Sequence, residues 1–194
     1  MLRYKLWSQI TMAVAGMGLL LFLATGVSLA DKNIFIETYD NLPGTPCEGL
    51  ALNDVSYSFT VAGAPSQDCT AGTMVGPGQT SDIQPPNIEG TAAGVLHLRF
   101  DVPTTEFGFG VALSTTNSPQ PNSVIINLYR PGAGLLRQEI ELTATSDPHF
   151  VGGHFDYSGP AVRTATIQFA NGSSFSRFVV DNVSYFRPPN KAQE

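Results

Sequence analysis

The chain has 194 residues, of which 13% are charged and 42% are hydrophobic, and its 10 basic and 16 acidic residues give a net charge of −6. This balance excludes an electrostatic nucleic-acid binder, which needs a basic surface to displace counterions. The apolar content excludes a disordered chain. The 19 glycines and 14 prolines predict many turns and few long helices.

The first thirty residues have the layout of a secretory signal peptide. Two basic residues open the chain, and the stretch from Ile10 to Ala30 carries no charge. Ser28 and Ala30 supply the small residues of a cleavage site, so we predict a cut between Ala30 and Asp31. The alternative is an uncleaved N-terminal anchor, because about 20 apolar residues span a bilayer. Cleavage predicts a secreted protein, extracellular or periplasmic, with no remaining membrane segment.

Two cysteines, Cys47 and Cys69, follow the predicted signal peptide. An even number of cysteines in an exported chain indicates a disulfide. The bond would stabilise the fold by about 3 kcal/mol, by the entropy of the loop that it closes. The alternative is a pair of free, buried thiols.

The remaining pattern predicts an all-β domain. No run shows helical periodicity beyond about two turns, whereas short alternating segments are separated by turn residues. Nine segments have this strand pattern: Asn33–Tyr39, Val55–Val61, Gly94–Asp101, Glu106–Leu113, Ser123–Arg130, Leu135–Leu142, Pro148–Tyr157, Ala161–Phe169 and Arg177–Phe186. Their spacing favours a two-sheet antiparallel β-sandwich, or jelly roll, over residues 31–187. A polar tail follows at residues 188–194.

The stretch Ala62–Thr91 is rich in Gly, Pro, Ser, Thr and Asp and shows no clear strand pattern. It is longer than a structureless connection usually is in a compact domain. We therefore expect it to contain a short strand or to form part of a binding rim.

Three pieces of sequence carry a family resemblance. They are Ile34–Glu37 leading into Asn41–Gly44, Phe100–Pro103 followed by Phe107–Gly110, and Arg177–Tyr185. In their order and spacing the chain resembles the jelly-roll, galactose-binding-like ectodomains of bacterial exosortase-sorted (PEP-CTERM) exported surface proteins. It differs from them at its C-terminus, where the sorting motif, apolar span and basic tail are missing.

The resemblance implies a structural calcium site. In the sandwiches that the chain resembles, acidic residues of the first and last strands share a calcium ion with main-chain carbonyls. The matching residues are Glu37 and Asp181, and calcium takes about six to eight oxygen ligands. The alternative is that Asp181 caps main-chain amides and Glu37 is half exposed.

Other polar residues fit a surface role better than a catalytic or metal-binding role. A zinc site needs three or four converging ligands, and His97, His149 and His154 are poorly placed for one. Glu139 and Glu141 are neighbours on one predicted strand face, whereas a glycosidase needs two carboxyls on opposing sides of a sugar. We expect surface histidines and a solvated acidic face.

These observations predict a non-catalytic exported β-sandwich of the cell surface or extracellular matrix, with a binding or structural role. Its partner would be a glycan or another component of the surface or matrix. The first alternative is a carbohydrate-binding module, which follows only from the resemblance in fold. The second is a secreted hydrolase that uses Glu139 and Glu141.

Overall fold

The computed structural model describes residues 33–115, 124–132, 134–169 and 175–187. The predicted signal peptide with its cut between Ala30 and Asp31, the turn at 170–172 and the tail 188–194 lie outside the described residues. Within the described ranges the chain forms strands and no helix. None of the described segments is therefore a helix long and apolar enough to cross a membrane.

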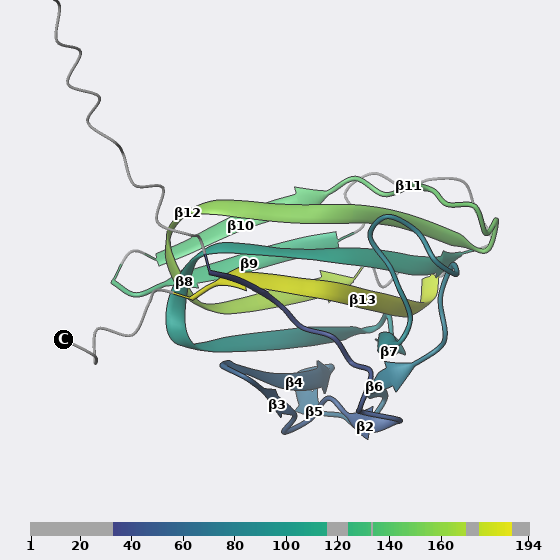
Figure 1. Cartoon of the computed structure of the whole chain (residues 1–194), viewed down its shortest axis with the longest axis horizontal. Helices are drawn as coiled ribbons and strands as arrows, with labels where there is room; N and C mark the ends of the chain where they lie inside the picture. Colours follow the sequence, from purple (N-terminus) through teal and green to yellow (C-terminus); the bar gives the residue numbers. More distant parts are fainter. Residues whose placement is uncertain (1–32, 116–123, 133, 170–174, 188–194) are drawn as a thin grey trace, which may run out of the picture. The chain divides into compact units, whose positions relative to one another are not determined.

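Thirteen strands are present in the described ranges (Figure 1). They are β1 (Ile34–Ile36), β2 (Thr45–Pro46), β3 (Ala51–Leu52), β4 (Val55–Val61), β5 (Ala64–Pro65), β6 (Cys69–Thr73), β7 (Asn87–Thr91), β8 (Gly94–Thr115), β9 (Val124–Arg130), β10 (Gly134–Ile140), β11 (Thr143–Ala144), β12 (Phe150–Phe169) and β13 (Phe175–Phe186).

The strands build two layers, which we name sheet I and sheet II. Sheet I consists of β4, the first part of β8 (94–100), the last part of β12 (164–169), β9 and β10. Sheet II consists of the first part of β12 (150–158), the last part of β8 (106–115), β13, β7, β6 and β2. β1 pairs with the end of β13. All of these pairs are antiparallel, so the predicted β-sandwich is confirmed.

β8 and β12 belong to both sheets because each bends in its middle, and the bend of β8 is visible at one end of the molecule (Figure 1). At the bend of β8, buried Thr104 donates its hydroxyl to the carbonyl of Glu106 at 2.5 Å and accepts the amide of Phe186 at 3.0 Å. At the bend of β12, the Tyr157 hydroxyl donates to the Pro160 carbonyl at 2.6 Å. Side-chain hydrogen bonds thus replace ladder bonds where the strands change sheet.

Aromatic side chains fill the space between the sheets. Phe169 of sheet I stacks on Phe178 of sheet II with ring centroids 3.9 Å apart. Phe59 of β4 also contacts Phe178, at 5.7 Å, and Phe100 meets Phe107 across the bend of β8 at 5.2 Å. The alternation of buried and exposed residues along each strand directs these rings inward, as expected for a sandwich.

The predicted segments correspond to β1, β4, β8, β9, β10, β12 and β13, whereas the short strands β2, β3 and β11 have no predicted counterpart. β4 has the predicted bounds, but the segments 94–101 and 106–113 join into β8, and 148–157 and 161–169 join into β12. The stretch 62–91 contains three strands, β5, β6 and β7. The expectation that it contains a short strand is therefore confirmed, and its irregular part narrows to residues 74–86.

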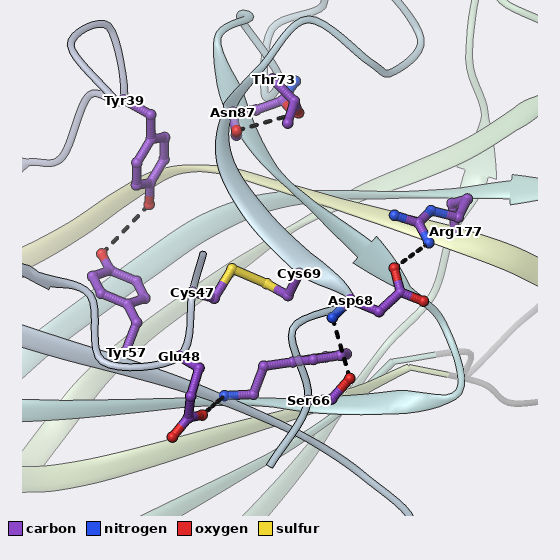
Figure 2. The surroundings of a disulfide bond; sticks show 11 residues. Tyr39, Cys47, Glu48, Tyr57, Ser66, Asp68, Cys69, Thr73, Asn87 and Arg177 are labelled. Carbon is purple, nitrogen blue, oxygen red and sulfur yellow. Dashed lines mark hydrogen bonds and ion pairs between the residues drawn. A yellow bond between two sulfur atoms is a disulfide. The ribbon is translucent and has the colours of Figure 1, made fainter. Parts of the chain in front are cut away.

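Cys47 and Cys69 form the predicted disulfide, with Cα atoms 5.4 Å apart (Figure 2). The amide of Cys47 also donates to the carbonyl of Cys69 at 2.9 Å. Both cysteines are buried. The bond joins the segment before β4 to the start of β6, so it fixes the edge of sheet II where the strands are shortest.

Candidate functional site

Glu37 is buried and its carboxylate is held by neutral donors. Its Oε1 accepts the hydroxyl of Tyr185 at 2.9 Å, and its Oε2 accepts the amide of Asn53 at 2.8 Å. Its own main-chain amide donates to the Val183 carbonyl at 2.8 Å. Burial raises the pKa of Tyr185, and so does the hydrogen bond to Glu37, so the hydroxyl stays a donor at neutral pH. Glu37 therefore links the start of the domain to β13.

Asp181 is also buried, but it has different partners. Its Oδ2 accepts the main-chain amide of Gln84 at 2.6 Å, and the amide of Asn182 donates to the same carboxylate. Burial raises the pKa of Asp181 to about 6, and repulsion from Asp40 adds to this effect. The alternative in which Asp181 caps main-chain amides is thus what the structure shows, whereas Glu37 is buried and not half exposed.

The predicted calcium ligands lie on neighbouring strands but share no partner. β1 pairs with β13 as expected, with Phe35 opposite Tyr185. Both oxygens of Glu37 are already occupied by Asn53 and Tyr185, while Asp181 accepts main-chain amides. Across the described ranges, His, Cys, Asp and Glu side chains form no group of three or more that could hold a metal ion. The calcium site therefore stays a prediction, and it would depend on main-chain oxygens.

The three histidines occupy separate surfaces. His97 lies on sheet I, where its Nε2 is 3.0 Å from the Thr60 hydroxyl, and burial lowers its pKa. His149 is exposed just before β12, with its Nδ1 2.9 Å from Asp147. His154 lies on the outer side of sheet II, beside Asp156 at 3.1 Å.

Glu139 points outward from β10, as predicted, and pairs with Arg137 at 2.9 Å. Glu141 follows the last residue of β10 and is exposed. Ile140 and Leu142, the neighbours on either side of Glu141, are buried as expected. The two acids thus belong to a solvated edge of sheet I.

The outer face of sheet I carries side chains in register across five strands. Its central row is made by one residue from each strand: Ser58, His97, Thr166, Asn127 and Arg137. Neighbouring strands are about 4.8 Å apart, so this row spans roughly 19 Å. Within it the Asn127 amide donates to the Thr166 hydroxyl at 3.2 Å. Four of the five residues are uncharged at pH 7, because the lowered pKa of His97 keeps its ring neutral.

An aromatic residue borders this row. Tyr129 of β9 is 43% exposed, and Leu135, opposite it on β10, is 54% exposed. Together they add an apolar patch beside the central row. Alternation in the sequence identifies the outward residues of each strand. Only the register between strands shows that five of these polar side chains form a row.

Residues 74–86 lie over the outer face of sheet II. Ile83 is 2% exposed and packs on Ala112 and Val179. The Asn182 amide donates to the Asp82 carbonyl at 3.1 Å, and Gln84 bonds to Asp181 as described above. Figure 1 shows this segment between β6 and β7 running across β13 and β8. It therefore forms a fixed wall on this face.

Comparison with known proteins shows the fold. No protein-family profile and no curated protein matches the sequence. A cleaved adhesin domain of Lys-gingipain has a TM-score of 0.50 at 11% identity, covering 80% of this chain and 99% of that one. A second adhesin domain of that protein, from Porphyromonas gingivalis, has a TM-score of 0.49 at 12% identity, with 78% and 96% covered.

A family 29 carbohydrate-binding module complexed with mannohexaose has a TM-score of 0.42 at 13% identity. The match covers 80% of this chain and 92% of that module. At these identities the likeness to the adhesin domains establishes a β-sandwich and no ligand.

Proposed function

We propose that the chain is an exported, non-catalytic binding module of the cell surface or extracellular matrix. One observation carries this proposal: on the outer face of sheet I, hydrogen-bonding side chains of five strands are in register. Side chains on strands of a packed sheet are held in place, so such a face is preorganised for a ligand. The buried disulfide supports export, because disulfides persist in oxidising compartments.

The ligand that best fits this face is a neutral glycan in an extended conformation. The hydroxyl of Ser58, the amide of Asn127 and the neutral ring of His97 both donate and accept hydrogen bonds, as sugar hydroxyls do, and buried Thr166 holds the Asn127 amide in place. Tyr129 offers an exposed ring on which the apolar face of a sugar can pack. We further propose kinship with the ectodomains of exosortase-sorted surface proteins, supported by the pairing of β1 with β13.

A hydrolase is the less favoured function. Glu139 is paired with Arg137 on an exposed edge, and Glu141 lies beyond the strand. We expect no glycosidase activity that depends on them. Hydrolysis screening of the wild type with Glu139→Gln and Glu141→Gln variants tests this. If the wild type hydrolyses a substrate and either substitution lowers that turnover, the hydrolase function would be favoured instead.

Binding is tested with the secreted protein, expressed with its own N-terminal segment. A glycan array and pull-down on insoluble polysaccharides should detect at least one neutral glycan. Tyr129→Ala and Asn127→Ala should each weaken that binding by about tenfold, the loss expected for one stacking or hydrogen-bonding contact. Ser158→Ala, an exposed change on sheet II, serves as the matched control. Binding that Tyr129→Ala and Asn127→Ala leave intact, or no glycan bound at all, would contradict this assignment.

We also propose that calcium binds as a structural ion at Asp181. Glu37 would become a calcium ligand only if it released its hydrogen bonds from Asn53 and Tyr185. A ligand that binds only the folded state raises the melting temperature. Calcium should therefore raise Tm, EDTA should reverse the effect, and Asp181→Asn should remove it. If neither calcium nor EDTA changes Tm, the proposal of a calcium site at Asp181 is wrong.

A further inference from the structure

A hollow lies over sheet II, on the side of the domain opposite the row on sheet I. It has a volume of about 320 Å³ and is enclosed between residues 77–83 and residues 143–146. Its floor is sheet II, where Ala112, Gly152 and Gly153 have little or no side chain. Ligand sites usually begin at about 300 Å³, so the hollow suits a ligand of one or two sugar units in size.

One wall of the hollow is preorganised. The Thr80 hydroxyl accepts the amides of Asp82 at 3.2 Å and Ile83 at 2.9 Å, while the Thr80 amide donates to the Ile83 carbonyl at 2.8 Å. Ile83 anchors this turn on sheet II, as described above. Gln79, Ser81 and Asp82 belong to the lining, on a backbone that these bonds hold in place. A ligand would therefore bind without first ordering this segment.

The opposite wall is fixed in the same way. The Thr145 hydroxyl donates to the carbonyls of Asp147 at 2.8 Å and Phe150 at 3.0 Å, and the Thr143 hydroxyl donates to the Gly152 carbonyl at 3.3 Å. These threonines hold the backbone of a wall to which the exposed residue Ser146 also belongs.

The charges of the lining select the class of ligand. Among the described residues that line the hollow, Asp82 is the one charged side chain, and none is basic. Phosphate, sulfate and carboxylate groups are therefore disfavoured. A carboxylate accepts hydrogen bonds from two neighbouring hydroxyls, and the hydroxyl and amide groups of Ser81, Ser146 and Gln79 complement further hydroxyls.

We propose that this hollow is a binding site for a small neutral polyol, a single sugar unit, with Asp82 as its principal ligand. The Oδ1 atom of Asp82 lies 3.7 Å from His154 Nδ1, and its main-chain carbonyl holds the segment to Asn182. The carboxylate is thus free of structural hydrogen bonds to the backbone, and its replacement leaves the docking of the wall unchanged. This site is separate from the face of sheet I, so either binding proposal can be refuted while the other stands.

The test is a titration of the intact protein, followed by backbone amide NMR, with glucose, galactose, mannose and N-acetylglucosamine, each added separately. At least one sugar should shift the amides of residues 79–83 and 144–146 saturably. Asp82→Asn should weaken that sugar by about tenfold or more, the loss expected for charge-assisted hydrogen bonds. Thr143→Leu, at an exposed residue of the lining that pairs with Gly152 of the floor, should fill the hollow and abolish binding, while the matched change Thr143→Ser, which keeps the hydroxyl, should preserve it.

Three controls accompany the titration. Tyr129→Ala should leave the sugar titration unchanged, since it lies on sheet I. Inorganic phosphate and methylamine should produce no saturable shift at these amides. The proposal is overturned if no sugar shifts residues 79–83 and 144–146, or if Asp82→Asn and Thr143→Leu both bind as the wild type does. A saturable response to methylamine would overturn it in favour of a cation site.

Discussion

Asp181→Asn is expected to change how the stability of the protein depends on pH. Asp181 is 2% exposed, and burial raises its pKa from 3.8 to about 6. In the unfolded chain the carboxyl group is solvated and loses its proton near its ordinary pKa. Between about pH 4 and 6 the native protein therefore holds a proton that the unfolded chain has released.

The sign and size of the effect follow from this difference. Because the native state binds more protons, the free energy of unfolding falls as the pH rises through this window. A pKa difference of about two units corresponds to about 3 kcal/mol, which is the upper limit of the loss. Asparagine does not titrate, and its carbonyl oxygen can still accept the Gln84 amide. Asp181→Asn should therefore remove the part of the pH dependence of the unfolding free energy that Asp181 causes.

The assay is urea unfolding followed by far-ultraviolet circular dichroism from pH 4 to 7.5, in EDTA so that no divalent cation favours the ionised carboxylate. The free energy of unfolding of the wild type should fall across this range relative to Asp181→Asn. Asp101→Asn, an exposed acid on β8, is the matched control and should follow the wild type. Wild-type and Asp181→Asn curves that stay parallel from pH 4 to 7.5 would refute the reasoning, since Asp181 would then have an ordinary pKa.

Three further changes test the packing. Reduction of the bond between Cys47 and Cys69, which are 22 positions apart, should lower the free energy of unfolding by about 3 kcal/mol in denaturant titrations. Gly110→Ala places a Cβ 1.9 Å from the Asp82 carbonyl oxygen, so hydrogen exchange of residues 82–84 should accelerate; unchanged protection would contradict the docked wall. Phe178→Ala, in the fully buried core, should cost about 3–5 kcal/mol, and a loss below about 1 kcal/mol would show that the site collapses.

The strands with clear alternation could be predicted from the sequence. In Val55–Val61 the hydrophobic residues fall at every second position, and β4 has the predicted bounds. Each long strand corresponds to two predicted segments, and Pro103 and the Gly159–Pro160 pair lie between them. In the structure, hydrogen bonds from Thr104 and Tyr157 carry the chain through these bends. These two bonds are local, whereas the bond from the Phe186 amide to Thr104 joins residues 82 positions apart and could not be read from the sequence.

β6 and β7 were not predicted as strands for a different reason. Their sequences, Cys69–Thr73 and Asn87–Thr91, have few β-branched or aromatic residues. They pair with each other and, through β7, with β13, so the sheet supplies the stability that the local sequence lacks. The ion pair of Arg177 with Asp68, at 2.6 Å, strengthens the same edge (Figure 2).

The candidate sites could be predicted only in part. Glu37 and Asp181 follow from the family resemblance, and the expected pairing of the first strand with the last is confirmed. The partner of Asp181 could not be found, since Gln84 lies 97 positions away in an irregular segment. The row on sheet I likewise required the register, because a shift of one residue in any strand would turn its polar side chain inward.

The local geometry of β13 explains how one strand serves both the core and the wall above sheet II. The pairing with β8 shifts between Asp181 and Ser184, and Asn182 has a φ of 51°. An irregularity of this kind places an additional residue on one strand and re-aims its side chains. Asp181 and Asn182 both bond to residues 82–84, while Val180 and Val183 remain buried in the core. With a regular ladder, consecutive side chains would point to opposite faces, and only one of the two could reach this segment.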